Sequence, residues 1–165
     1  MRSSDMEGRA HRYLVALGSN MRVPGVGGPR RVLGKVRSDF ERRGLLVEGF
    51  SPLLRSRPIG PSQREYANGA AIVAAQQGPR EMLDLLQEIE HQYGRRRTGA
   101  PWRRRQLDLD IILWSGGRWS SPDLAIPHPL FRGRGFVLQP AAAIAPDWRD
   151  PVTGLTLRQL AARAS

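Results

Sequence analysis

Two aspartates separated by one residue are the part of this sequence that most directly suggests chemistry. Asp108 and Asp110 lie in LDLDIILW, residues 107–114, and the alternation of polar and apolar residues there predicts a β-strand. Residues i and i+2 of a strand face the same side, so both carboxylates point one way. Like charges this close repel each other, and either arginines or Mg²⁺ can relieve the repulsion. The pattern leaves two alternatives: a sheet face neutralised by arginine, or a metal site that keeps positions for phosphate oxygens.

A basic segment runs directly into this strand. Residues 95–105, RRRTGAPWRRR, hold six arginines and no acidic residue, and Gly99 and Pro101 indicate a loop. Guanidinium groups bind phosphate through paired hydrogen bonds and stay charged, and Trp102 adds a flat face for a purine. Charge alone allows a small phosphate, a nucleic acid or a membrane surface as the partner.

A histidine held between two prolines follows the strand. Pro127 and Pro129 restrict the backbone on both sides of His128, and Arg132 and Arg134 come soon after it. This context favours a contact to a phosphate or a leaving group. A purely structural histidine is the alternative.

Composition excludes several classes of protein. The chain has 165 residues, a net charge of +11 and no cysteine, which excludes thiolate zinc sites and thiol catalysis. Lys35 is its single lysine and is followed by Val36, so there is no Walker A phosphate loop. No apolar run is long enough to span a membrane, and residues 1–11 predict a flexible polar tail without a secretory signal. We therefore expect a cytoplasmic location.

The spacing of apolar residues predicts the elements that would position these groups. Strands are expected at 13–18, 45–56, 68–76 and 107–114, and helices at 29–43, 80–92, 136–143 and 156–163. Pro52 should interrupt the second strand or place it at an edge, and residues 115–118 predict a hairpin turn with a short return strand. This order predicts a single domain of the ferredoxin-like α+β class, with helices packed on an antiparallel sheet in three αβα layers.

Four segments together resemble the 6-hydroxymethyl-7,8-dihydropterin pyrophosphokinase family of folate biosynthesis. They are YLVALGSN (13–20), SRPIGPSQREYANGAA (56–71), IEHQYGRRR…PWRRRQLDLDIILW (89–114) and IPHPLFRGRGFVLQPAAAIAP (126–146). The resemblance implies a domain at 12–165 that transfers pyrophosphate from ATP to the pterin hydroxymethyl group, releases AMP and uses two Mg²⁺ ions. We also expect a monomer that binds neither nucleic acid nor membranes.

The resemblance also implies roles for individual residues. Asp108 and Asp110 would hold the metals, and Arg95 and Arg105 would meet the phosphates. The remaining ATP contacts would be Gln87, Glu90, Arg97, Trp102 on a closing loop, Ile111, His128 and Arg134. The pterin pocket would comprise Ser56, Pro58, Ile59, Tyr66, Asn68 and Phe136, with Tyr66 and Phe136 on the two faces of the ring.

This sequence departs from the family pattern at a few positions. Arg57 stands where many members have proline, and Pro129 stands where some carry an aromatic residue. Arg96, Arg103 and Arg104 exceed what the pattern requires. Two other interpretations stay open: a basic nucleic-acid-binding protein, and a family member that binds ligands without catalysis.

Overall fold

The structure is a computed structural model, and it describes residues 11–20, 25–56, 66–94 and 107–164. The expected N-terminal tail lies almost entirely outside the described residues.

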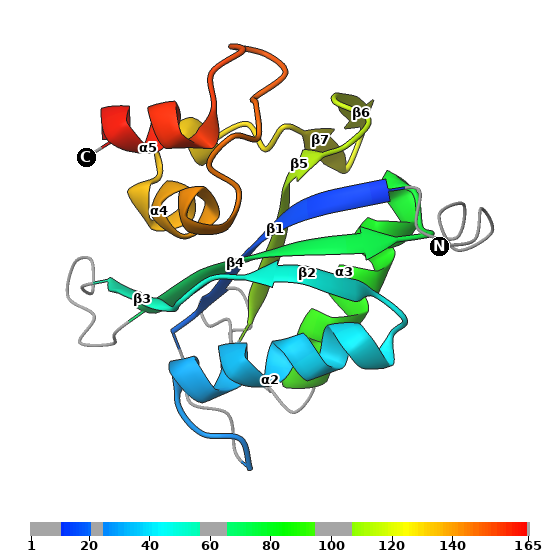
Figure 1. The fold of residues 1–165 in the computed structure, drawn as a ribbon. Coiled ribbons are helices and arrows are strands. Elements are labelled where there is room, and N and C mark those ends of the chain that lie inside the picture. Colours follow the sequence, from blue (N-terminus) through cyan, green and yellow to red (C-terminus); the bar gives the residue numbers. More distant parts are fainter. Residues whose placement is uncertain (1–10, 21–24, 57–65, 95–106, 165) are drawn as a thin grey trace.

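Five strands form one antiparallel sheet. They are β1 (His11–Ser19), β2 (Leu46–Phe50), β3 (Leu54–Ser56), β4 (Tyr66–Ala75) and β5 (Asp108–Trp114). The order across the sheet is β2-β4-β1-β5, and β3 pairs with the start of β4. With its two crossover helices, this is the order of a ferredoxin-like fold, and the predicted class is confirmed (Figure 1).

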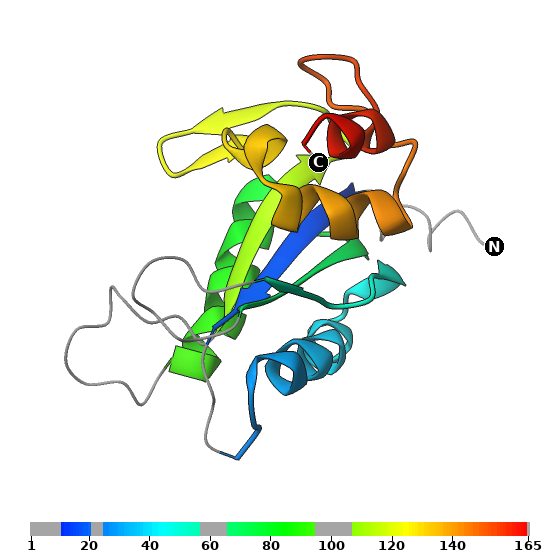
Figure 2. The same cartoon turned by 90° about the vertical axis from the view of Figure 1, so that its left-hand side faces the viewer.

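Helices cover both faces of the sheet. The helices α2 (Pro29–Arg42) and α3 (Pro79–Gly94) lie on one face, and α4 (Gly135–Ile144) and α5 (Leu157–Ala164) lie on the other (Figures 1 and 2). These bounds agree with the predicted helices to within two residues.

Strand alternation divides the interior into two cores. On β1, Tyr13 and Val15 pack with α2 and α3, whereas Leu14 and Ala16 pack with α4 and α5. The first set forms the α2–α3 core and the second forms the α4–α5 core. The same alternation places the side chains of Asp108, Asp110 and Asn68 on the α4 side of the sheet.

One extra residue interrupts the alternation in β5. Leu14 pairs with Leu113, but Val15 pairs with Ile111, so Ile112 forms a bulge. The Ile112 carbonyl accepts a hydrogen bond of 3.0 Å from the backbone N–H of His128. The bulge thus ties β5 to the chain that leads into α4.

Two sequence-based expectations need comment. Residues 51–53 separate β2 from β3, so the predicted interruption at Pro52 is confirmed. The predicted hairpin, in which a strand after residues 115–118 would pair with the strand at 107–114, is wrong. The strand that follows the turn, β6 (Trp119–Ser121), instead pairs with β7 (Leu124–Ile126) in a separate two-stranded sheet. No helix in the described part of the chain is long and apolar enough to cross a membrane.

Candidate active site at the open end of the sheet

Three neighbouring strands place an amide and a carboxylate in one row. Asn68 on β4 pairs with Gly18 on β1, and Gly18 pairs with Asp108 on β5. Directly paired residues of antiparallel strands point to the same face, and strands lie about 4.8 Å apart, so Asn68 and Asp108 stand roughly 10 Å apart across a glycine. A Cβ atom at Gly18 would lie 3.5 Å from Asn68 Oδ1. Because Gly18 has no side chain, the sheet surface between the Asn68 amide and the Asp108 carboxylate is left open.

Three carboxyl groups gather at the β5 edge. The Leu109 N–H donates a 2.8 Å hydrogen bond to Glu90 Oε2, which brings this α3 side chain beside Asp108 and Asp110. Burial, and with it the charges of Asp108 and Asp110, raise the pKa of Glu90 to about 7 against the lowering effect of the Leu109 N–H. The cluster thus concentrates three carboxyl groups at this edge of the sheet.

His128 and Arg134 approach the same cluster from the chain before α4. The Leu130 N–H donates to His128 Nδ1 at 3.1 Å, which places the proton of the neutral ring on Nε2. Burial, and then the positive charge of Arg134, lower the pKa of His128, while Asp108 acts in the opposite direction. At neutral pH the imidazole is therefore an uncharged hydrogen-bond donor.

The start of α4 brings an aromatic ring next to this arginine. Arg134 is the N-terminal cap residue of α4, and its guanidinium carbon lies 5.7 Å from the centroid of the Phe136 ring. Phe136 is 40% exposed, which is unusual for a phenylalanine in a helix that covers a sheet. Tyr66 and Asn68 lie on the sheet face that α4 covers. An amide and two aromatic side chains therefore lie on the α4 side of the sheet: Asn68 and Tyr66 on β4, and Phe136 at the start of α4.

The carboxylates have the chemistry that Mg²⁺ requires. Mg²⁺ binds through one or two carboxylates and keeps its other positions for water and substrate phosphates. Asp108 and Asp110 supply two carboxylates on one strand face. In the described ranges no group of three or more His, Asp or Glu side chains is arranged to hold a metal by itself. This arrangement fits a metal that is bound together with a phosphate ligand.

The structure does not bring every predicted residue to this cluster. Gln87 is exposed on α3 and lines a surface depression with Arg43 and His91. Ile111 is buried in the α2–α3 core, so only its main chain can contact a nucleotide. The backbone of Ser56 pairs with Tyr66 at the end of β3. The predicted contacts at Arg95, Arg97, Trp102, Arg105, Pro58 and Ile59 lie outside the described residues.

One position in the row was missed by sequence reasoning. Gly18 sits within an apolar strand, and a glycine there often marks a close approach of backbone or ligand. A glycine inside a buried strand is the sequence signal that points to this position.

Comparison with known proteins finds close relatives over most of the chain. The family model for 7,8-dihydro-6-hydroxymethylpterin-pyrophosphokinase (HPPK) matches residues 14–146. A 2-amino-4-hydroxy-6-hydroxymethyldihydropteridine pyrophosphokinase of Synechocystis is 38% identical over 95% of this chain and 78% of its own length. The Pseudomonas aeruginosa protein of the same name is 39% identical over 85% of this chain and 84% of its own length.

A solved structure supports the same fold. The crystal structure of wild-type Plasmodium falciparum HPPK-DHPS matches 93% of this chain with a TM-score of 0.66 at 12% identity. The match spans 44% of that longer chain, so it concerns one part of it. Together, the matched residues and the similarity to these relatives show that the chain belongs to the 7,8-dihydro-6-hydroxymethylpterin-pyrophosphokinase family.

Proposed function

We propose that this chain transfers the β,γ-pyrophosphoryl group of ATP to the hydroxymethyl group of 6-hydroxymethyl-7,8-dihydropterin and releases AMP. The observation that carries the proposal is the row from Asn68 across Gly18 to Asp108, with Asp110 beside it on the same face. Family membership supports this reaction and its place in folate biosynthesis.

The amide end of the row suits the pterin. A flat heterocycle with donors and acceptors along one edge needs an amide that can do both, and aromatic faces to stack on. Asn68 is 6% exposed and would supply the amide, and Tyr66 and Phe136 would supply the faces. We include Ser56, Pro58 and Ile59 as further walls of this pocket.

The acidic end suits the metal and the phosphates. Asp108 and Asp110 would hold two Mg²⁺ ions, which when bound neutralise the triphosphate and lower the pKa of the pterin hydroxyl. Arg95, Arg97 and Arg105 are proposed to bind the phosphates, with Gln87, Glu90, Trp102 and the Ile111 main chain on the nucleotide side. His128, as an uncharged donor, would hydrogen-bond a phosphate oxygen without adding a full charge.

The reaction is an in-line displacement at phosphorus. The pterin hydroxyl oxygen forms a bond to the β-phosphorus and loses its proton, and the bond from that phosphorus to the α,β-bridging oxygen breaks. AMP departs with the bridging oxygen. The residues of this chain contribute positioning and charge compensation, because such a transfer needs little covalent participation by protein groups.

Other features belong to the same proposal. A domain at 12–165, a monomeric state, a cytoplasmic location and the absence of nucleic-acid partners are predictions from the sequence. The competing interpretation, a nucleic-acid-binding protein, would show binding that falls steeply with salt and does not need Asp108 or Asp110.

One assay tests the proposed function. The protein is incubated with ATP, Mg²⁺ and 6-hydroxymethyl-7,8-dihydropterin, and AMP is quantified against a reaction without pterin. Pterin-dependent AMP release is the expected result. A folded protein that binds both ligands and releases no AMP would instead support the non-catalytic family member.

A further inference from the structure

We propose that Asp150 is a positioning residue for ATP binding, because its ion pair with Arg132 fixes the segment that carries His128 and Arg134. The inference rests on the proposed function. It assigns a role to chain that lies C-terminal to residue 146, where the match to the family model ends.

Asp150 is fully buried, and both of its oxygens are occupied. Arg132 Nε donates to Oδ2 at 2.6 Å and Arg132 Nη2 donates to Oδ1 at 2.8 Å, which is a bidentate pair. The Val152 N–H donates to Oδ1 at 3.0 Å, and the Thr153 hydroxyl donates to Oδ2 at 2.7 Å. Although burial alone would raise it, these hydrogen bonds hold the pKa of Asp150 well below its usual range. The carboxylate is therefore a fixed, charged anchor.

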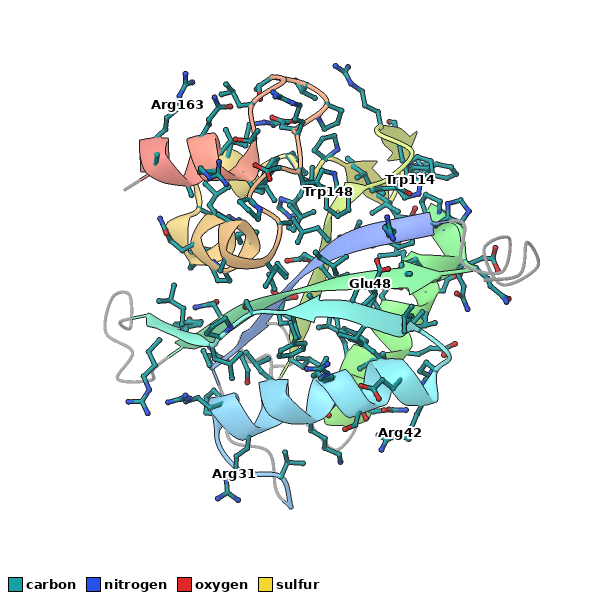
Figure 3. The ribbon with its side chains drawn as sticks, in the orientation of Figure 1. Arg31, Arg42, Glu48, Trp114, Trp148 and Arg163 are labelled. Carbon is teal, nitrogen blue, oxygen red and sulfur yellow. The ribbon has the colours of Figure 1, made fainter. Side chains whose placement is uncertain are left out.

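The turn that presents Asp150 is itself held in place. The Asp150 N–H donates to the Leu155 carbonyl and the Gly154 N–H donates to the Asp150 carbonyl, both at 2.8 Å. The Leu157 N–H then donates to the carbonyl of Trp148, and Leu157, the first residue of α5, is buried in the α4–α5 core. Trp148, labelled in Figure 3, belongs to the segment that connects α4 to α5. The anchor is thus attached to the α4–α5 core.

Arg132 connects Asp150 to the segment that carries His128 and Arg134. Its guanidinium carbon lies 4.8 Å from the centroid of the Phe131 ring, and Phe131 is fully buried. The Phe131 carbonyl accepts the Arg134 N–H at 3.1 Å, and the Phe131 N–H reaches the His128 carbonyl at 3.5 Å. The single turn at Phe131–Gly133 therefore links both predicted ATP contacts, and a shift of Arg132 would move Arg134.

A second bidentate pair, which is more exposed to solvent, provides a control far from this segment. Arg12 Nε and Nη2 donate to the two Glu48 carboxylate oxygens at 2.7 and 3.0 Å. Arg12 lies six residues before Gly18 on β1, roughly 20 Å from the row at the acidic end. Glu48, labelled in Figure 3, lies toward the Trp114 end of the sheet. Its loss removes an ion pair of the same geometry without touching the segment before α4.

The test compares Asp150→Asn with Glu48→Gln. Steady-state kinetics give kcat and the KM values for ATP and pterin, and calorimetry gives the Kd of α,β-methylene-ATP with Mg²⁺. For Asp150→Asn we expect both the KM for ATP and this Kd to rise about tenfold, since displacements near 1 Å can cost more than that. The KM for pterin should rise less than the KM for ATP, because Asn68 and Tyr66 are held by the sheet and only Phe136 follows Arg134 into α4. Glu48→Gln should change neither nucleotide value.

Asp150→Asn leaves Arg132 beside a neutral amide in a buried site, so its stability must be measured too. Arg132→Lys keeps a positive charge but loses the bidentate geometry, and an intermediate rise in the analogue Kd is expected from it. A lowered melting temperature with unchanged nucleotide affinity in both variants would overturn the proposal and make the pair purely stabilising. If the unmodified protein binds the analogue but releases no AMP, the proposed function fails, while the Kd comparison still tests the anchor.

Discussion

Asp108 and Asp110 share one strand face, and the carboxyl group of Glu90 reaches them from α3. The residues differ in what they do: the aspartates face the α4 side, whereas Glu90 is tied to the backbone of Leu109. This arrangement yields one prediction for an aspartate and one for the glutamate.

Replacing Asp110 by alanine should abolish turnover while the protein stays folded. The carboxylate is proposed to hold a metal at the phosphates, and a single charge-stabilising group is commonly worth about 10²–10³ in rate. AMP release gives the rate, and a thermal melt confirms folding. Asp84→Ala, at an exposed carboxylate on α3, is the control and should keep normal turnover. Normal turnover in Asp110→Ala would contradict the metal role.

Replacing Glu90 by glutamine should change how stability depends on pH. The pKa of Glu90 is raised to about 7 in the folded protein, so the folded state binds this proton more tightly than the unfolded state does. The parent protein therefore loses stability relative to Glu90→Gln as the pH rises from about 4.5 through about 7, by about 3 kcal/mol.

Urea unfolding of both proteins in EDTA at pH 5 and pH 8 measures this difference. The glutamine variant should gain relative stability at pH 8. If the difference in unfolding free energy between the two proteins is the same at pH 5 and pH 8, the pKa of Glu90 is not raised in the folded state.

The sequence allowed some of these residues to be located, but not all. Alternation in LDLDI was enough to place both aspartates on one face, and the same alternation put Ile111 in the opposite core. The pair between Arg132 and Asp150 joins irregular segments 18 residues apart and has no periodic signal. Only the folded chain brings them together.

At the scale of elements, the end of α3 is fastened to α2. The Tyr93 hydroxyl donates to Oδ2 of the buried Asp39, and Arg42 donates to its Oδ1. Burial, and then the bond to Asp39, raise the pKa of Tyr93 above its usual range. This contact sets the direction in which α3 presents Glu90 one turn earlier.

Tyr93→Phe should destabilise the protein by about 1–3 kcal/mol, because the buried carboxylate loses a donor. Urea unfolding followed by circular dichroism measures the loss. Tyr13→Phe offers a comparison, since its hydroxyl donates to the Gln77 carbonyl at 2.6 Å, a neutral acceptor. A smaller effect from Tyr93→Phe than from Tyr13→Phe would mean that Arg42 alone satisfies Asp39.

Long periodic elements were predictable, and short ones were not. Helices α2 and α3 carry apolar residues at helical spacing, so their existence followed from the sequence. The strands β6 and β7 have three residues each, and β6 is largely serine. Such short segments carry no pattern that selects a partner, which explains why the return strand was paired wrongly.

At the scale of the whole molecule, the sheet separates two cores that lie at different positions relative to the proposed site. The α2–α3 core contains the side chains opposite the site, whereas the α4–α5 core lies behind the segment with His128 and Arg134. The α4–α5 core depends on α5, which follows the family match at residue 146.

Leu157→Ala should therefore cost about 2–5 kcal/mol, as expected for a fully buried leucine. Chemical denaturation measures this cost. Leu130→Ala is the control, because Leu130 is 59% exposed and its truncation should change stability by less than about 0.5 kcal/mol. Equal effects of the two variants would show that α5 adds little to the stability of the domain.

The bulge at Ile112 divides β5 into two stretches with opposite alternation. Before it, even-numbered residues face α4; beyond it, Leu113 joins the α4–α5 core and Trp114 packs with the other one. A gain or loss of one residue in a strand normally turns every following side chain to the other face. Asp108 and Asp110 precede both the bulge and the turn at 115–118, and residues 108–111 pair directly with β1. A gain or loss of one residue near that turn would therefore leave both acids facing the proposed substrates.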